Sequence, residues 1–330
     1  MIGRREFITV LGGAAAAWPI AARAQQTAKV SRIGFVAGGG RPPSLESSLY
    51  AGFAQGMREL GYIEGKDFTI DYRFAEGQYE RFRAIGAEFA RLRVDIILVG
   101  ASFAVPAMRE ANPSTPIVLG YSIDPVGQGH VASLARPGGN TTGLSSALHE
   151  IVAKQVDLLL AAVPNLRRLA VLYNPASSGY ALSFKTIEAT AQQAGIGLRP
   201  TPASSPQEIE ATFDALGGER VDAVIGLADA LFSTRRQRIA QLMLRARLPS
   251  NFSAREYTEA GTLMSYGDSL QEFYRRAASF VDKIIKGAKP GDLPVEQPTK
   301  FQFVLNRKSA EALGIVIPAN LYIFADEVIE

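Results

Sequence analysis

Short apolar runs alternate with amphipathic segments along most of this chain. The first run, Ile33–Val36, ends in a glycine-rich loop at 38–43, and apolar residues at helical spacing follow from Leu49 to Leu60. Further apolar runs at 94–99 and 117–121 come after helix-like stretches. Buried strands of a parallel sheet are apolar throughout, and each needs a crossover, usually a helix, to reach the next. This order predicts an α/β fold with parallel sheets flanked by helices.

The same order begins again in the second half of the chain. Helix-like stretches and apolar runs succeed one another at 148–162, 169–173, 206–216 and 221–227. The segment 136–143 between the halves is rich in glycine and other turn formers, which is typical of a domain boundary. Because 47% of the 330 residues are hydrophobic, the chain has enough apolar side chains to form two cores. We expect one unit over residues 25–145 and a second over residues 146–266.

The first 24 residues have the pattern of a cleaved export signal. Arg4 and Arg5 precede an aromatic residue, an apolar run extends from Val10 to Ala22, and small residues stand at the first and third places before a cut at Gln25. Paired arginines indicate the twin-arginine export route. The apolar run is shorter than the roughly 20 residues that span a bilayer, so we expect no membrane-embedded segment after cleavage.

Cysteine content and charge limit the cell compartments and the classes of partner that we expect for this protein. The chain contains no cysteine, so it has neither a thiol for a lipid anchor nor a disulfide. A soluble exported protein without an anchor would be lost from a cell with one membrane, which favours the periplasm of a Gram-negative cell. Removing the signal, with Arg4, Arg5, Arg23 and Glu6, lowers the formal charge from +3 to +1. This near-neutral balance argues against a nucleic-acid partner.

Signals of catalysis and of cofactor binding are weak. The two histidines, His130 and His149, have no cysteine to join them in a metal site, and the chain contains no G-x-S-x-G motif. The glycines at 38–40 stand between a strand and a helix, but Pro43 and Ser44 break the dinucleotide-binding spacing. The amides of this loop, including that of Gly40, either bind a polar ligand group or form a simple turn. We therefore predict a protein that is not an enzyme and has no cofactor and no metal.

Several segments resemble those of one known family. They are GYIEGKD at 61–67, ASLARPGGNTTG at 132–143, LMSYG at 263–267, DKIIKGAKP at 282–290, PVEQPTKF at 294–301 and ADEVIE at 325–330. In these segments the chain resembles the ABC-transporter substrate-binding proteins of the tryptophan/tyrosine type. The matching segments extend over most of the chain.

The resemblance implies a two-lobed fold like that of the type I periplasmic binding proteins, with a ligand cleft between the lobes. It implies that the chain crosses between lobes more than once. We expect residues of about 267–292 to return to the first lobe, with a hinge at Gly267, and residues 293–330 to belong to the second. Ligands of open parallel sheets bind at the carboxyl ends of the strands, which indicates the same site.

The loops at those strand ends supply the candidate ligand-binding residues. They are Gly40, Ser102, Tyr121, Ser122, Asp124, Asn174, Tyr180, Asp229, Phe252 and Tyr266. The aromatic residues would cover an apolar ligand body, the serines and the asparagine would form hydrogen bonds, and Asp124 or Asp229 would pair with an ammonium. Two alternatives remain open. Asp124 and Asn174 precede prolines, where they commonly form Asx turns, and Asp229 could cap the helix that follows it.

The resemblance implies the periplasmic substrate-binding component of an ABC importer. Such a protein binds a small molecule by hinge closure and delivers it to the permease subunits in the membrane. An amino acid or a related aromatic or apolar zwitterion is the expected ligand, and we expect a monomer. The alternative hypothesis is a periplasmic sensor of the same fold that presents its bound form to a membrane receptor or kinase.

Overall fold

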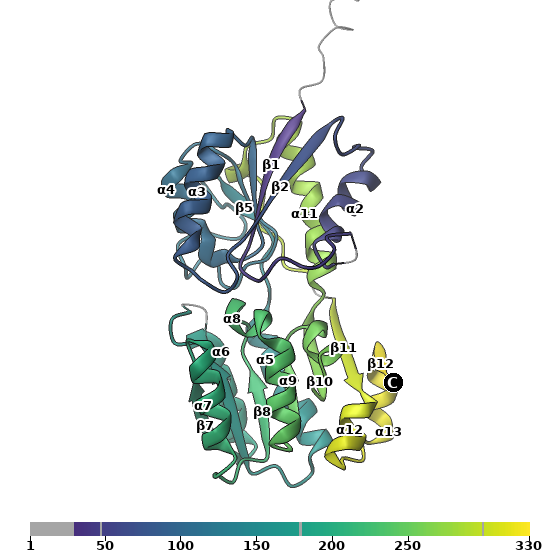
Figure 1. Ribbon diagram of the computed structural model, residues 1–330. Helices are drawn as coiled ribbons and strands as arrows, with labels where there is room; N and C mark the ends of the chain where they lie inside the picture. The colour runs from purple at the N-terminus through teal and green to yellow at the C-terminus, as the bar shows by residue number, and fades with distance from the viewer. Residues whose placement is uncertain (1–29, 47, 178–179, 299) are drawn as a thin grey trace, which may run out of the picture.

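The computed structural model describes residues 30–46, 48–177, 180–298 and 300–330. The export signal predicted over residues 1–24 lies outside this part of the chain. The described residues form two lobes, each built on a sheet with helices on both faces (Figure 1). This architecture confirms the predicted α/β fold class. Among the described residues, no helix has both the length and the apolar character needed to cross a membrane.

The sheet of the first lobe is parallel throughout. Its strand order is β2-β1-β3-β4-β5. The strands are β1 (Ser31–Ala37), β2 (Phe68–Phe74), β3 (Ile96–Val99), β4 (Ile117–Leu119) and β5 (Thr141–Gly143). Side chains alternate between the faces, so that Ile33 and Phe35 enter one core and Val36 the other. Residues 33–37 of β1 and all of β3 are buried on both faces, which is why these stretches are apolar runs.

Helices cover both faces of this first sheet. α2 (Ala51–Glu59) and α11 (Leu270–Ile285) pack on one face, and α3 (Arg81–Leu92) and α4 (Val105–Ala111) on the other, with the short 3₁₀ helix η1 (Ser102–Ala104) before α4. Gly52 and Gly56 let α2 lie against the backbone of α11. A Cβ atom on either glycine would stand 2.2 Å from a carbonyl oxygen of α11, that of Gln271 or that of Arg275.

The sheet of the second lobe is mixed. Its order is β12-β11-β10-β9-β8-β6-β7. The strands are β6 (Arg168–Tyr173), β7 (Gly197–Pro202), β8 (Ala223–Gly226), β9 (Ser250–Phe252), β10 (Met264–Asp268), β11 (Phe301–Asn306) and β12 (Glu327–Ile329). The parallel order expected from the sequence fails between β10 and β11, which are antiparallel with Tyr266 opposite Phe303. The reason is topological: β11 enters this sheet after the chain has passed through the first lobe, and it runs back along the edge of β10.

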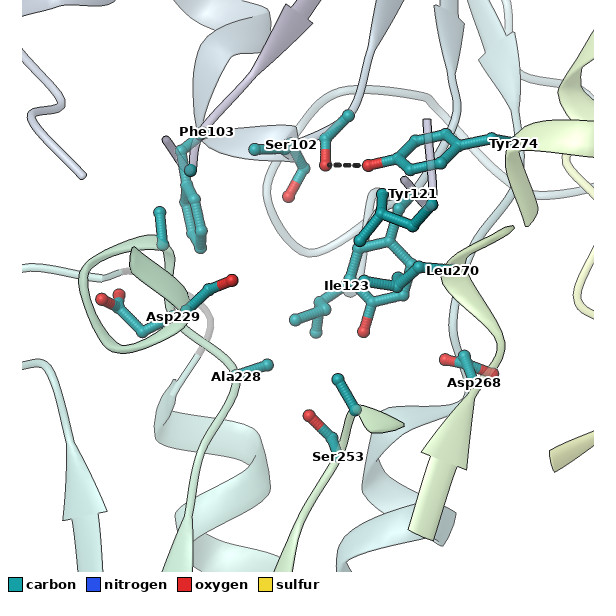
Figure 2. Close-up of a pocket in the computed structure, with 18 of the residues that line it drawn as sticks. Ser102, Phe103, Tyr121, Ile123, Ala228, Asp229, Ser253, Asp268, Leu270 and Tyr274 are labelled. Carbon is teal, nitrogen blue, oxygen red and sulfur yellow. Dashed lines mark hydrogen bonds between the residues drawn. The ribbon is translucent and has the colours of Figure 1, made fainter. Parts of the chain in front are cut away.

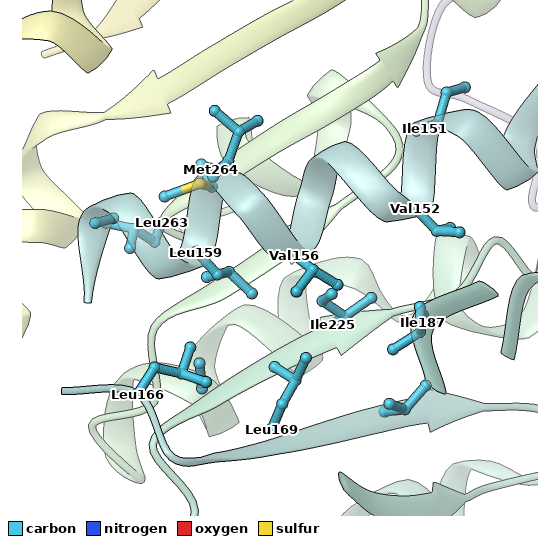
Figure 3. Close-up of a cluster of buried hydrophobic side chains, with 14 of the residues drawn as sticks. Ile151, Val152, Val156, Leu159, Leu166, Leu169, Ile187, Ile225, Leu263 and Met264 are labelled. Atoms are coloured by element: carbon cyan, nitrogen blue, oxygen red, sulfur yellow. The ribbon is translucent and has the colours of Figure 1, made fainter. Parts of the chain in front are cut away.

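Helices also cover both faces of the second sheet. α5 (Leu148–Ala162), α6 (Tyr180–Gln193), α12 (Arg307–Leu313) and α13 (Ala319–Phe324) contribute to one core. α7 (Pro206–Leu216), α8 (Ala230–Thr234), α9 (Arg236–Arg245) and α10 (Arg255–Glu259) contribute to the other. Figure 3 shows the first core, where Val156 and Leu159 of α5 lie over Leu169 and Ile225 of the sheet.

Among the described residues, the chain passes between the lobes at 144–147, at 268–269 and at 293–298, and the connecting segments lie side by side (Figure 1). The first and last of these touch, because the amide of Ser145 donates a hydrogen bond of 2.9 Å to the carbonyl of Glu296. The short 3₁₀ helix η2 (Pro290–Asp292) precedes the last passage. α11 thus packs in the first lobe, whereas β11 and β12 lie in the second sheet.

The segment 136–143, which the sequence predicts to be a linker, contains a strand. Its last three residues form β5, a buried edge strand in which Thr141 pairs with Ile117. The side-chain amide of Asn140 donates to the carbonyl oxygens of Pro113 (3.2 Å) and Thr115 (2.8 Å), which anchors the start of this strand. Turn-forming residues dominate the segment, and its strand is stabilised by segments distant in the sequence: by β4 and by a hydrogen bond of 2.7 Å from the Thr142 hydroxyl to the carbonyl of Leu293.

Candidate functional site

A cavity of about 120 Å³ lies between the lobes, where the carboxyl ends of several strands meet (Figure 2). The first lobe contributes Gly38, Gly39, Leu49, Tyr50, Gly100, Ala101, Ser102, Phe103, Tyr121, Ile123, Leu270 and Tyr274. The second lobe contributes Ala228, Asp229, Ala230, Ser233, Ser253, Ala254, Tyr257 and Asp268. Apolar and aromatic side chains with a few polar groups are typical of small-molecule sites.

Packed aromatic rings form much of the first-lobe wall. The ring centroids of Tyr50 and Tyr274 are 5.6 Å apart, and the Tyr274 hydroxyl donates to the carbonyl of Gly100 at 3.3 Å. A Cβ atom at Gly100 would lie 2.8 Å from that hydroxyl, so glycine lets the loop after β3 approach the ring. The ring of Tyr121 packs edge-on against Phe273, with a centroid distance of 5.4 Å. These contacts hold rigid rings at the cavity before any ligand arrives.

The second-lobe wall has one aromatic ring and two carboxylates. The ring of Tyr257 stacks on Phe252 at a centroid distance of 4.3 Å, and Phe252 itself is buried beneath it. The Tyr257 hydroxyl is buried and has no hydrogen-bond partner among the described residues. Because an unpaired buried hydroxyl is costly, a polar partner would stabilise this group. The carboxylates of Asp229 and Asp268 lie on opposite sides of the cavity (Figure 2).

Asp229 is held by donors from both lobes. Its Oδ1 accepts from the amide of Leu231 at 2.8 Å and from Asn174 Nδ2 at 3.2 Å. Its Oδ2 accepts from the hydroxyl of Tyr79, which belongs to the first lobe. Burial raises the pKa of Asp229, although these hydrogen bonds act in the opposite direction. Asp229 therefore caps α8, the alternative that the sequence left open, and it also links the two lobes.

Asp268 is less well paired. It is the last residue of β10, and its side chain is buried. One carboxylate oxygen accepts a hydrogen bond from the hydroxyl of Ser146, and the other has no partner among the described residues. Burial raises the pKa of the Asp268 carboxyl to about 6. A carboxylate in this state is suited to bind a cationic or hydrogen-donating ligand group.

The sequence family follows from comparison with known proteins. The family model "ABC transporter substrate binding protein" matches residues 41–329, which is most of the chain. The chain belongs to this family. A tyrosine-binding protein of Clostridioides difficile (strain R20291) is 22% identical over 273 residues, which are 83% of this chain and 78% of that protein. The resemblance inferred from the sequence motifs is thereby confirmed.

Two solved structures share the architecture closely. A conserved domain protein from Vibrio cholerae is 27% identical, with a TM-score of 0.84, and the alignment covers 91% of this chain and 100% of that one. An ABC domain from Streptococcus pneumonia, solved in complex with L-Trp, is 26% identical with the same TM-score of 0.84 and the same coverage of 91% and 100%. The substrate-binding protein described here therefore has the two-lobed type I architecture.

In this substrate-binding protein, three of the ten residues predicted for the site line the cavity. They are Ser102, Tyr121 and Asp229. Asn174 lies behind them: it donates to Asp229, and its own Oδ1 accepts from the amide of Ala176 at 3.0 Å, which closes the Asx turn. Gly40 lies beside Thr234, whereas Gly38 and Gly39 of the same loop line the cavity.

The other predicted residues lie outside the cavity lining. Asp124 has a positive φ of 47°, and its Oδ1 accepts from the amide of Gly127 at 2.9 Å, so it forms a turn. Ser122 is fully buried, and Phe252 supports Tyr257 from behind. Tyr180 stacks on Tyr173 with a centroid distance of 4.8 Å, and Tyr266 packs against Phe301 at 5.8 Å. Each of these rings packs against an aromatic residue of its own lobe, and the sequence alone does not predict those contacts.

Asp268, Tyr257 and the tyrosines at 50 and 274 also line the cavity, although they are not among the ten residues predicted for the site. Asp268 follows the family-like run at 263–267 and is the last residue of β10 before α11 begins. Its position at a strand end was therefore a usable signal. Tyr257 stands in the segment that follows β9, so its position was a usable signal too, although α10 is too short to show a periodic pattern.

His130 has a structural role in the first lobe. His130 is buried, its Nε2 lies 3.1 Å from Gln128 Oε1, and burial, aided by the charge of Arg109, lowers its pKa to about 4. The ring is therefore neutral at physiological pH. Among the described residues, no cluster of His, Cys, Asp and Glu has the size needed to hold a metal ion.

Proposed function

We propose that this protein is the periplasmic binding component of an ABC importer and that it takes an aromatic or apolar amino acid into the cavity between its lobes. One observation carries the proposal: rings from both lobes, those of Tyr50, Tyr121 and Tyr274 on one side and Tyr257 on the other, enclose a cavity that also holds a buried carboxylate. Aromatic faces supply contact area for an apolar side chain, and a carboxylate satisfies an ammonium.

Relatives and physical chemistry support this class of ligand. One similar protein is named for tyrosine binding, and one similar structure was solved with L-Trp. Both of these ligands combine an aromatic body with a zwitterionic end. Family membership supports transport over catalysis, because the family is one of solute-binding proteins rather than of enzymes.

Closure of the lobes over the ligand is part of the proposal. The hydrogen bond from Tyr79 to Asp229 joins the lobes at the cavity, and ligand contacts with both walls would add to it. A ligand shifts a two-state equilibrium only by its preference for one state, so contacts with both walls favour the closed form. Binding would then be transmitted to the permease as a change in the relative position of the lobes.

The test is isothermal titration calorimetry of the mature protein, starting at Gln25, against L-tryptophan, L-tyrosine and L-leucine, with L-glutamate as the control. We expect dissociation constants in the micromolar range or tighter for at least one of the first three and no measurable binding of L-glutamate, whose second carboxylate would face Asp268 or Asp229. If none of the three binds, the proposed ligand class is wrong.

A further inference from the structure

Asp268 lines the cavity, and one of its carboxylate oxygens has no hydrogen-bond partner among the described residues. The residue is 5% exposed, so the carboxylate is almost entirely removed from water. Oδ2 accepts from the Ser146 hydroxyl, and Oδ1 has no hydrogen-bond partner among the described residues. Figure 2 shows the carboxylate facing the cavity from the end of β10, on the side of Tyr121 and Leu270.

The other cavity carboxylate, Asp229, is already occupied. It accepts from Tyr79, Asn174 and the amide of Leu231, so both of its oxygens have partners. In Figure 2 its carboxylate points away from the middle of the cavity. A ligand cation at Asp229 would have to displace hydrogen bonds that also cap α8 and join the lobes. At Asp268, Oδ1 has no hydrogen bond to lose among the described residues.

Nothing in the cavity wall neutralises Asp268. Among the described residues that line the cavity, none is Lys, Arg or His. Tyr121 and Tyr266 are titratable neighbours of the carboxylate, and its negative charge helps to raise the pKa of each hydroxyl. Buried carboxylates are normally paired with a cation or with several donors. The missing partner is therefore to be sought in the ligand.

We infer that Asp268 is the residue that recognises the ligand, by pairing its free carboxylate oxygen with a primary ammonium group while the apolar body of the ligand lies against the aromatic wall. This inference rests on the proposed function, since it takes the cavity between the lobes as the binding site. It assigns the charge recognition to Asp268 instead of Asp229. It also defines the ligand class as an ammonium attached to an aromatic or apolar body.

The ligand series that tests this inference needs no variant protein. Calorimetry would compare L-tryptophan with tryptamine, which lacks the carboxylate, and with indole-3-propionate, which lacks the ammonium. We expect the wild-type protein to bind at least one of the two ammonium compounds and to bind indole-3-propionate at least about 30-fold more weakly, the ratio that corresponds to losing a buried charge pair.

Three variants then show which carboxylate pairs with the ammonium of the ligand. Asp268→Asn keeps the shape and the acceptor for Ser146 but loses the charge, and we expect about 30-fold weaker binding or more. Asp229→Asn should cost clearly less than Asp268→Asn. Asp282→Asn is the matched control, because Asp282 is also buried, at 8% exposure, but lies in α11 outside the cavity lining. This variant should bind the ligand as the wild-type protein does. Circular dichroism and thermal melts would establish that each variant is folded.

The possible failures are distinguishable. If tryptophan binds but indole-3-propionate binds equally well, or if Asp268→Asn binds like wild type, the assignment of Asp268 is overturned and the proposed function stands. If tryptamine binds and no amino acid does, the assignment stands provided that Asp268→Asn abolishes the binding, and the proposed amino-acid function falls. If no ammonium compound binds, both are overturned.

Discussion

Replacing Asp268 by asparagine should stabilise the unliganded protein at neutral pH. The folded state raises the pKa of this carboxyl from 3.8 to about 6, because burial disfavours its charged form. The folded protein thus favours the neutral carboxyl. That preference supports folding fully below pH 3.8 and is lost as the pH rises through about 6. At higher pH the buried charge opposes folding.

The magnitude follows from the two pKa values. At about 1.4 kcal/mol per pH unit, the difference between 3.8 and about 6 corresponds to about 3 kcal/mol at pH 7.5. At pH 4.5 the wild-type carboxyl is largely neutral in the folded state, and the cost falls to about 1 kcal/mol. Asparagine is neutral at both pH values. The variant should therefore gain about 3 kcal/mol at pH 7.5 and about 1 kcal/mol at pH 4.5.

The assay is a pair of thermal melts of wild type and Asp268→Asn without ligand. For a domain of this size, about 3 kcal/mol corresponds to a rise of about 6 to 12 °C in melting temperature at pH 7.5, with a smaller rise at pH 4.5. Ser146 supplies the control, because Ser146→Ala removes the hydrogen bond to Asp268 without removing the charge and should lower stability at pH 7.5. An Asp268→Asn variant whose melting temperature falls at pH 7.5, or rises equally at both pH values, would refute the reasoning. A binding residue that destabilises the empty protein is a common compromise between stability and function.

Three further predictions concern packing, closure and export. Gly56→Val in α2 should cost at least about 1 to 3 kcal/mol in urea denaturation, because its Cβ would lie 2.2 Å from the backbone oxygen of Arg275; an unchanged midpoint would show that the helices separate easily. Tyr79→Phe removes the hydrogen bond that joins the lobes at Asp229, so the unliganded variant should have a larger radius of gyration by small-angle X-ray scattering. A radius equal to that of wild type would show that this contact does not hold the lobes together. Replacing Arg4 and Arg5 by lysines should stop export through the twin-arginine route, measured as loss of the mature protein from the periplasmic fraction; an undiminished periplasmic yield would exclude that route.

The fold could be predicted in outline because its information is local. Ile33 and Phe35 alternate with Val36 across a sheet that is buried on both faces, so the run is apolar throughout and indicates a parallel strand. The stretch Pro206–Leu216 was expected as a helix and forms α7, with Ser205 as its cap. What failed was the direction of β11 and the existence of β5. Both depend on which strand edge the chain meets after a long excursion, and no window of sequence contains that information.

By itself, the sequence determined the repeated strand and helix order, the family and the loops in which the site would lie. Each of these follows from hydrophobic periodicity or from a contiguous motif. Ser102, Tyr121 and Asp229 could be placed at the cavity for that reason. Only the tertiary structure decided which carboxylate oxygens have hydrogen-bond partners and which do not. Asp229 is saturated by Tyr79, 150 residues away, and by Asn174, whereas Asp268 receives one hydrogen bond, from Ser146, 122 residues away. Whether each carboxylate keeps an unpaired oxygen thus depends on hydrogen bonds between segments that are distant in the sequence, and those bonds form only in the folded protein.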